Sequence, residues 1–210
     1  MTAGLDEVGR GSWAGPLCIC VAVFQPDTPR VEGVKDSKKL TPRKREELVE
    51  PILKAAHFVG FGWASPQYID EHGLSAAWHA AALDALELAP KDEMHLIVDG
   101  RDEVHGYDGV QSAMEKADDL YYPVSAASIV AKVARDMDMV RMDKHYPGYL
   151  WNQNAGYGTK QHKEAIFDLG VTPYHRRSFL KKMIAKSRMT AAGSRLASAV
   201  EGFHTSPDSS

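Results

Sequence analysis

Carboxylate side chains stand in this 210-residue chain at points where short apolar segments end or a helical segment begins. They are Asp6 and Glu7, Asp99, and the pair Asp118 and Asp119. Mg²⁺ and Mn²⁺ prefer oxygen ligands, and a site for two such ions needs three or four carboxylates from different segments. If the fold brings these segments together, the pattern predicts a divalent-metal site. The alternative from the residues alone is turns and surface charge.

The first carboxylate pair raises a geometric difficulty. Neighbouring residues on a strand point to opposite faces of the sheet, so Asp6 and Glu7 cannot both reach one ion from an ideal strand. Either a β-bulge lies at this point, or one of the two side chains acts from the strand end, where the chain turns.

The elements that must position these carboxylates alternate between strands and helices. The turn Gly9-Arg10-Gly11 is so short that the strands on either side of it form an antiparallel hairpin, which makes the sheet mixed. Residues 101–117 and 146–159 are predicted as irregular segments. The fold class is therefore α/β. Strands are predicted at residues 3–7, 17–24, 57–64 and 95–98, and helices at residues 42–55, 75–88, 125–144 and 160–169.

The helix predicted at residues 125–144 follows the last carboxylate pair. Ser125 is its expected N-cap. Its apolar residues fall at steps of four, four and three positions and form one continuous stripe, which consists of Ile129, Val133, Met137 and Val140.

Length and composition are typical of a single globular domain. The chain is 44% hydrophobic and 25% charged, which excludes a wholly disordered protein. We expect one catalytic domain over residues 1–186, with a core at about 1–145 and a helical C-terminal part at about 146–186. Residues 187–210 are rich in Ser, Ala, Gly and Thr and are predicted to form a flexible tail.

No segment predicts membrane insertion or secretion. The longest strongly apolar stretch, residues 16–24, is far shorter than the roughly 20 residues that span a bilayer. Cys18 and Cys20 stand too close together along one strand for an ordinary disulfide, which favours buried thiols in a reducing compartment. We therefore expect a cytoplasmic protein with no membrane partner, and the sequence gives no sign of assembly beyond a monomer.

Charge is distributed unevenly along the chain, although the net charge is only −3. Residues 65–119 contain 13 acidic and 3 basic side chains, whereas residues 132–188 contain 12 basic and 5 acidic ones. Residues 30–54 contain 8 basic and 5 acidic side chains. An acidic centre between basic segments suits a cation site beside a polyanion track. Two solvated faces of a soluble protein are the alternative.

Four groups of short motifs follow one another along residues 3–180. The first consists of Asp6-Glu7-Val8-Gly9-Arg10-Gly11, Ala14-Gly15-Pro16, Asp36-Ser37-Lys38-Lys39-Leu40-Thr41 and then Asp99-Gly100. The second consists of Lys116-Ala117-Asp118, Ser125-Ala126-Ala127-Ser128-Ile129-Val130-Ala131-Lys132 and Arg135-Asp136. The third consists of Asn154, Gly156-Tyr157-Gly158-Thr159 and His162, and the fourth of Gly170, Thr172-Pro173 and His175-Arg176-Arg177-Ser178-Phe179. Together these motifs resemble the ribonuclease HII family. Ser12-Trp13 and Ala155 depart from the family's pattern without touching an expected ligand.

The resemblance implies a ribonuclease-H-like fold, a mixed β-sheet flanked by helices with a helical C-terminal part. It implies an endoribonuclease that hydrolyses the RNA strand of RNA–DNA hybrids and cuts 5′ of ribonucleotides embedded in duplex DNA. The products would carry a 3′-hydroxyl and a 5′-phosphate, and the biological role would be removal of RNA primers and misincorporated ribonucleotides.

The resemblance also implies two divalent ions, Mg²⁺ or Mn²⁺. Their ligands would be four catalytic carboxylates, and these map onto Asp6, Glu7, Asp99 and Asp118. Asp118 rather than Asp119 takes the fourth place because it precedes Ser125 by the family's spacing, which leaves Asp119 as a solvated neighbour.

The same resemblance implies the substrate contacts. Gly9-Arg10-Gly11 is assigned to the ribose 2′-hydroxyl, since glycines let the backbone approach a sugar closely. Tyr157 is assigned to the sugar at the RNA–DNA junction, and Lys38 and Arg176 are expected at phosphates. The alternatives are a tight hairpin turn, a tyrosine that anchors its own loop, and solvated surface charges.

Other functions would fit parts of this pattern. Ribonuclease HIII carries a substrate-binding extension before its first carboxylate, whereas five residues precede Asp6 here, so we expect the HII type. Another nuclease on the same fold, such as a junction resolvase, is a second alternative. A nucleic-acid-binding module without catalysis is the third, and it would show no metal-dependent cleavage.

Overall fold

A five-stranded mixed sheet forms the centre of the computed structural model, which describes residues 1–187. Its strands are β1 (Thr2–Val8), β2 (Leu17–Phe24), β3 (Phe58–Ala64), β4 (His95–Asp99) and β5 (Val110–Met114). They lie in the order β3-β2-β1-β4-β5. Strand β2 is antiparallel to β1 and β3, whereas β4 is parallel to β1 and β5. The N-terminal hairpin and the mixed α/β class are therefore confirmed.

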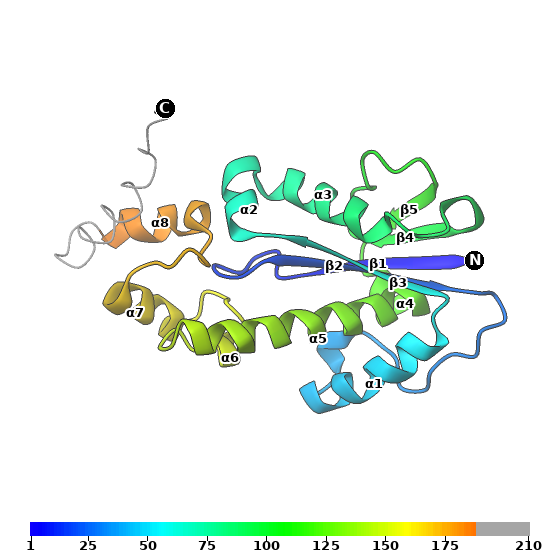
Figure 1. The fold of residues 1–210 in the computed structure, drawn as a ribbon, viewed down its shortest axis with the longest axis horizontal. Coiled ribbons are helices and arrows are strands. Elements are labelled where there is room, and N and C mark those ends of the chain that lie inside the picture. Colours follow the sequence, from blue (N-terminus) through cyan, green and yellow to red (C-terminus); the bar gives the residue numbers. More distant parts are fainter. Residues whose placement is uncertain (188–210) are drawn as a thin grey trace.

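Helices cover both faces of the sheet (Figure 1). Helices α2 (Pro66–His72) and α3 (Leu74–Leu86) lie over one face, and α1 (Pro42–Ala55) and α5 (Tyr122–His145) lie over the other. The C-terminal part is helical, as expected, and consists of α6 (Trp151–Asn154), α7 (Lys160–Leu169) and α8 (Arg177–Ser187). The short elements are α4 (Ala117–Leu120), η1 (Ser37–Lys39) and η2 (Lys91–Glu93).

Alternating side chains of the central strands form an apolar layer on each face of the sheet. Leu5 of β1 packs toward α2 and α3, whereas Cys18 and Cys20 of β2 pack toward α1 and α5, where both thiols are free and buried. Helix α5 lies very close to β1. A Cβ atom on Gly4 would lie 2.1 Å from the backbone nitrogen of Val124, so this approach requires glycine. The contact fixes α5 beside the end of β1.

Three local predictions were wrong. Residues 101–117 are not irregular throughout, because they contain β5, a half-exposed strand at the sheet edge that lacks a clear alternation. Ser125 does not cap α5, which begins at Tyr122; instead its hydroxyl donates to the carbonyl oxygen of Asp118 at 2.6 Å. The segment predicted as a loop at residues 146–159 contains the short helix α6.

The apolar stripe predicted for α5 is only partly buried. Ile129 lies in the core, but Met137 and Val140 are 67% and 43% exposed. In the C-terminal half of α5 the buried residues are Arg135 and Met139, and Met139 packs with the C-terminal helical part. Helix α5 therefore joins the sheet to that part through a different face from the one the stripe indicates.

None of the helices within residues 1–187 is long and apolar enough to cross a membrane. The predicted tail at residues 187–210 lies outside the described residues except for Ser187, which ends α8. The expected domain boundaries stay predictions.

Candidate active site

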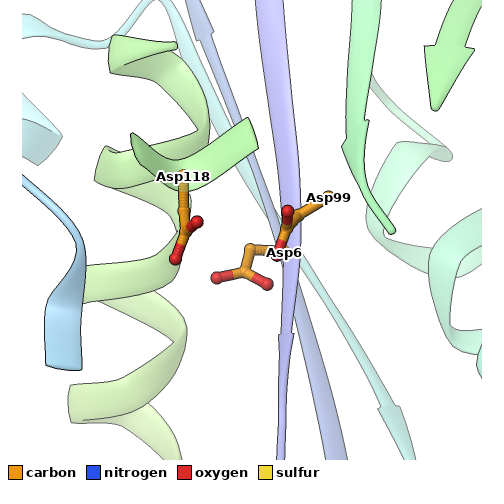
Figure 2. Close-up of side chains that lie close together, drawn as sticks. All are labelled: Asp6, Asp99 and Asp118. Atoms are coloured by element: carbon orange, nitrogen blue, oxygen red, sulfur yellow. The ribbon is translucent and has the colours of Figure 1, made fainter. Parts of the chain in front are cut away.

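Three carboxylates from three elements meet at one edge of the sheet. Asp6 lies near the end of β1, and Asp99 ends β4, the parallel neighbour of β1, so both side chains leave the sheet at the same edge. Asp118 comes from α4. One carboxylate oxygen of each lies within 4.8 Å of the others, and Figure 2 shows the three side chains gathered around one space. The structure thus brings together three of the four carboxylates expected from the sequence.

We call this group the aspartate triad (Asp6, Asp99 and Asp118), and hydrogen bonds hold two of its carboxylates, those of Asp6 and Asp99. Asp6 accepts from the backbone N–H of Glu7 at 2.7 Å and also hydrogen-bonds the Ser128 hydroxyl. Asp99 accepts from the backbone N–H of Ala117 at 2.8 Å. These hydrogen bonds orient the carboxylates of Asp6 and Asp99 and come from uncharged donors.

The pKa of Asp6 is raised to about 7, mainly by burial; the nearby charges of Glu7 and Asp99 contribute to the rise, and the hydrogen bond with Ser128 opposes it. Burial also raises the pKa of Asp118, with Asp99 and Asp36 acting in the same direction and Lys38 opposing them. A bound cation would relieve this repulsion. The donor set consists only of carboxylate oxygens, which suits hard divalent ions such as Mg²⁺ and Mn²⁺ rather than soft metals.

Glu7 lies apart from the triad. Its carboxylate accepts from the Trp78 indole N–H at 3.1 Å and lies 3.8 Å from an Arg10 guanidinium nitrogen. Burial raises its pKa, although Trp78 and Arg10 oppose the shift. Glu7 lines a pocket of about 250 Å³ together with Asp99 and Asp102. The alternation of side chains along β1 therefore separates Glu7 from Asp6, and Asp99 is the triad member that also borders the pocket of Glu7.

Lysines of η1 lie beside the triad. The ammonium nitrogen of Lys38 is 3.8 Å from a carboxylate oxygen of Asp118, while its side chain is 80% exposed. Asp36 caps η1 by accepting from the backbone N–H of Lys38 at 2.9 Å. Lys39 pairs instead with Asp119, whose side chain is half-exposed. Asp118 belongs to the triad and Asp119 does not, and the role of Asp118 as a metal ligand, which the resemblance implies, stays a prediction.

The loop between β1 and β2 contains the Gly9-Arg10-Gly11 turn. Gly9 has a φ of +90°, and a Cβ atom on it would lie 2.1 Å from Nε of Arg135, so only glycine fits there. A Cβ atom on Gly11 would meet no atom within 4 Å, so this glycine borders open space. The turn therefore offers an accessible stretch of backbone next to the triad-bearing strand.

Tyr157 lies in a second loop that is bonded to the first. The backbone N–H groups of Trp13 and Ala14 both donate to the carbonyl oxygen of Gly156, at 2.8 and 3.1 Å. Tyr157 remains 38% exposed. The residue expected to sense the junction thus stands in a loop directly tied to the loop that carries the Gly-Arg-Gly turn.

Arg176 differs from the surface phosphate contact expected from the sequence. Its side chain is fully buried, and its guanidinium donates to the carbonyl oxygens of Gly15 and Arg10, each at 3.0 Å. Burial lowers its pKa to about 9, and the nearby Arg135 charge acts in the same direction. In this position Arg176 supports the backbone of the turn.

Sequence reasoning assigned no role to three residues that hold the site. Ser128 bonds Asp6 and Trp78 bonds Glu7, while Arg135 contacts both loops. Ser128 and Arg135 lie inside the second group of motifs, which was the available signal, whereas nothing in the sequence singles out Trp78.

Comparison with known proteins gives a consistent result over nearly the whole chain. A family model described as "Ribonuclease HII" matches residues 3–182. Ribonuclease HII of Clostridioides difficile is 43% identical over 181 residues, which cover 86% of this chain and 70% of that protein. Ribonuclease HII of a Jannaschia species is 41% identical, with coverage of 85% and 89%. The crystal structure of ribonuclease H2 from Pyrococcus horikoshii has a TM-score of 0.71 at 28% identity and covers 95% of this chain and 98% of that one.

Proposed function

The chain belongs to the ribonuclease HII family, and from this premise we propose how its residues bind the substrate and cut it. The protein is an endoribonuclease that degrades RNA in RNA–DNA hybrids. We propose that it also cuts 5′ of single ribonucleotides embedded in duplex DNA, leaves 3′-hydroxyl and 5′-phosphate ends, and removes RNA primers and misincorporated ribonucleotides. The observation that carries the proposal is the aspartate triad next to an accessible Gly-Arg-Gly turn.

Metal dependence follows from the family and suits the aspartate triad. We propose two divalent ions, Mg²⁺ or Mn²⁺, with the triad as the main ligands. Glu7 would complete the ligand set from the pocket that it shares with Asp99. When bound, such ions lower the pKa of the attacking water and stabilise the charge on the departing 3′ oxygen. No side-chain nucleophile is required in this reaction.

The remaining residues bind and orient the nucleic acid. The exposed ammonium group of Lys38 stands beside Asp118, where it would contact the phosphate that is cut. The open space at Gly11 leaves room for a ribose, whose 2′-hydroxyl would bond the backbone of the turn. The exposed part of the Tyr157 ring would stack on the sugar that follows the ribonucleotide. Arg176 would act indirectly by holding the Arg10 carbonyl.

A labelled DNA duplex with one ribonucleotide tests this assignment. Wild type should cut it with Mg²⁺ or Mn²⁺ and not with EDTA. Asp118→Asn should lower the rate by roughly 100-fold or more, as expected when a charge that acts on the transition state is lost. Asp119→Asn is the matched control and should keep most of the activity, because Asp119 pairs with Lys39 outside the triad.

Two outcomes would overturn the proposal. Comparable losses in Asp118→Asn and Asp119→Asn would mean that the wrong aspartate has been assigned. Binding of the duplex without metal-dependent cleavage would favour a non-catalytic binding module. The monomeric state and the cytoplasmic location expected from the sequence stay predictions.

A further inference from the structure

Arg135 carries a buried guanidinium group to which the proposed cleavage mechanism assigns no role. It lies on α5 and is fully buried. Within the part of the chain that the structure describes, its guanidinium donates four hydrogen bonds, all to neutral oxygens. Burial lowers its pKa, because moving the charged guanidinium out of water costs free energy. A residue held in this way is expected to serve a specific geometric purpose.

Three of these hydrogen bonds hold the loop between β1 and β2. Nε donates to the carbonyl oxygen of Pro16 at 2.8 Å, and Nη2 donates to the Ser12 hydroxyl at 2.7 Å and to the carbonyl oxygen of Ala14 at 3.1 Å. Ser12 in turn donates its hydroxyl proton to the Gly9 carbonyl at 2.9 Å. Arg135 is thus linked through one hydroxyl to the first residue of the Gly9-Arg10-Gly11 turn.

The fourth hydrogen bond reaches the other loop. Nη1 of Arg135 donates to the carbonyl oxygen of Ala155 at 2.9 Å, and its Cζ atom lies 5.8 Å from the centre of the Tyr157 ring. That distance is within the range of a cation–π contact. The guanidinium of Arg135 therefore lies against Gly9 of the turn and also against the ring of Tyr157.

We propose that Arg135 is a positioning residue that holds the Tyr157 ring at a fixed distance from the Gly9-Arg10-Gly11 turn and thereby sets the preference for a ribonucleotide followed by DNA over continuous RNA. The proposal rests on the proposed function of Tyr157. The planar guanidinium bonds several acceptors in fixed directions, whereas a lysine ammonium would keep the charge without that geometry. The ring lies against the guanidinium while part of it stays exposed for the substrate.

The test compares kcat/KM on a duplex with one embedded ribonucleotide and on a long RNA–DNA hybrid. Arg135→Lys should lower the ratio of the two values by about fivefold or more, the lower end of what loss of one stacked ring gives. Tyr157→Ala should lower the ratio similarly. The double variant should show no further fall in the ratio, because both changes remove the same ring placement.

Arg176→Lys is the matched control. Arg176 is also a buried arginine bonded to carbonyls of the first loop, but its guanidinium lies over the Phe179 ring, 5.3 Å from the ring centre. Because Arg176 holds the turn at Arg10 but leaves the contact between Arg135 and the Tyr157 ring in place, its replacement should lower both rates and change their ratio less than Arg135→Lys does. The control therefore separates general support of the loop from placement of Tyr157.

Equal losses on the two substrates in Arg135→Lys, with a lower Tm, would overturn the inference and leave Arg135 as a structural residue. If Tyr157→Ala leaves the ratio unchanged, the proposed function of Tyr157 fails and this inference falls with it. A ratio that depends on Tyr157 but not on Arg135 refutes the positioning role alone.

Ser12→Ala provides a second route if Arg135→Lys does not fold. This change removes the hydroxyl that accepts a hydrogen bond from Arg135 and donates one to the Gly9 carbonyl oxygen, while the Arg135 guanidinium stays in place. The ratio should shift in the same direction by a smaller factor, and this shift should vanish in a Tyr157→Ala background. An unchanged ratio in Ser12→Ala would overturn the proposal.

Discussion

Replacing Asp6 by asparagine should stabilise the metal-free protein while abolishing cleavage. Burial, aided by Glu7 and Asp99, raises the pKa of Asp6 from 3.8 to about 7. A raised pKa in the folded state means that protonated Asp6 stabilises the fold below about pH 4, and this contribution is lost as the pH rises to about 7. Asparagine keeps the shape and the acceptor for the Glu7 N–H but carries no charge at any pH.

The expected gain in the free energy of unfolding follows from the size of the pKa shift of Asp6. About three pKa units correspond to about 4 kcal/mol, at roughly 1.36 kcal/mol per unit. Asp6 is only 6% exposed, so solvent screening reduces this figure little. Part of the shift comes from Glu7 and Asp99, however, and their own protonation changes with that of Asp6. We therefore expect Asp6→Asn to raise the free energy of unfolding by about 2–4 kcal/mol at pH 8, and by about half as much or less at pH 5.

Urea denaturation in EDTA at both pH values measures this difference, with the m-value as a check that the unfolded states are comparable. Added Mg²⁺ should raise the midpoint of the wild type and have little effect on the variant. Asp119→Asn should show no such pH-dependent gain, since its side chain is half-exposed and paired with Lys39. An Asp6→Asn variant no more stable than the wild type at pH 8 would refute the reasoning.

Three further predictions concern activity. Tyr157→Ala should lower kcat/KM at a single embedded ribonucleotide by roughly 5- to 150-fold and affect a long hybrid less; equal losses together with a clear fall in Tm would show that Tyr157 only anchors its loop. Glu7→Gln should reduce the cleavage rate less than Asp99→Asn, because Glu7 lies outside the triad, and equal losses in the two variants would contradict this ranking. Cleavage at subsaturating substrate should fall steeply with salt, by about one unit of log–log slope for each phosphate contact. A flat salt response would mean that the basic segments 30–54 and 132–188 face away from the duplex.

Two of the triad carboxylates, Asp6 and Asp99, have a local signal in the sequence, whereas Asp118 was assigned only through the family resemblance. Asp6 and Asp99 end apolar segments, and a rigid strand end presents such a side chain at the sheet edge. The separation of Glu7 from Asp6 also follows from the two-residue period of a strand. The parallel pairing of β1 with β4 is different, because it joins segments far apart in the chain and depends on packing on both faces.

The parts that could not be predicted depend on tertiary structure. Arg176 was expected at a phosphate through the family resemblance, yet it is buried, where the carbonyl oxygens of Gly15 and Arg10 accept its hydrogen bonds. Those oxygens belong to a loop whose path no local pattern indicates. Strand β5 was missed for a related reason, since its half-exposed residues show no clear alternation and its pairing with β4 defines it.

Helix α5 sets the distance between the aspartate triad and the two loops, because it forms hydrogen bonds with both. Ser128 bonds Asp6 in the triad, and Arg135 bonds the loops that carry the turn and Tyr157. The two positions are seven residues apart in the sequence, which corresponds to about two helical turns and a rise of about 10 Å. One residue inserted between them would rotate Arg135 by about 100° and carry it away from both loops. We therefore expect an insertion or deletion in this stretch of α5 to change the distance between the aspartate triad and the loops that carry the Gly9-Arg10-Gly11 turn and Tyr157.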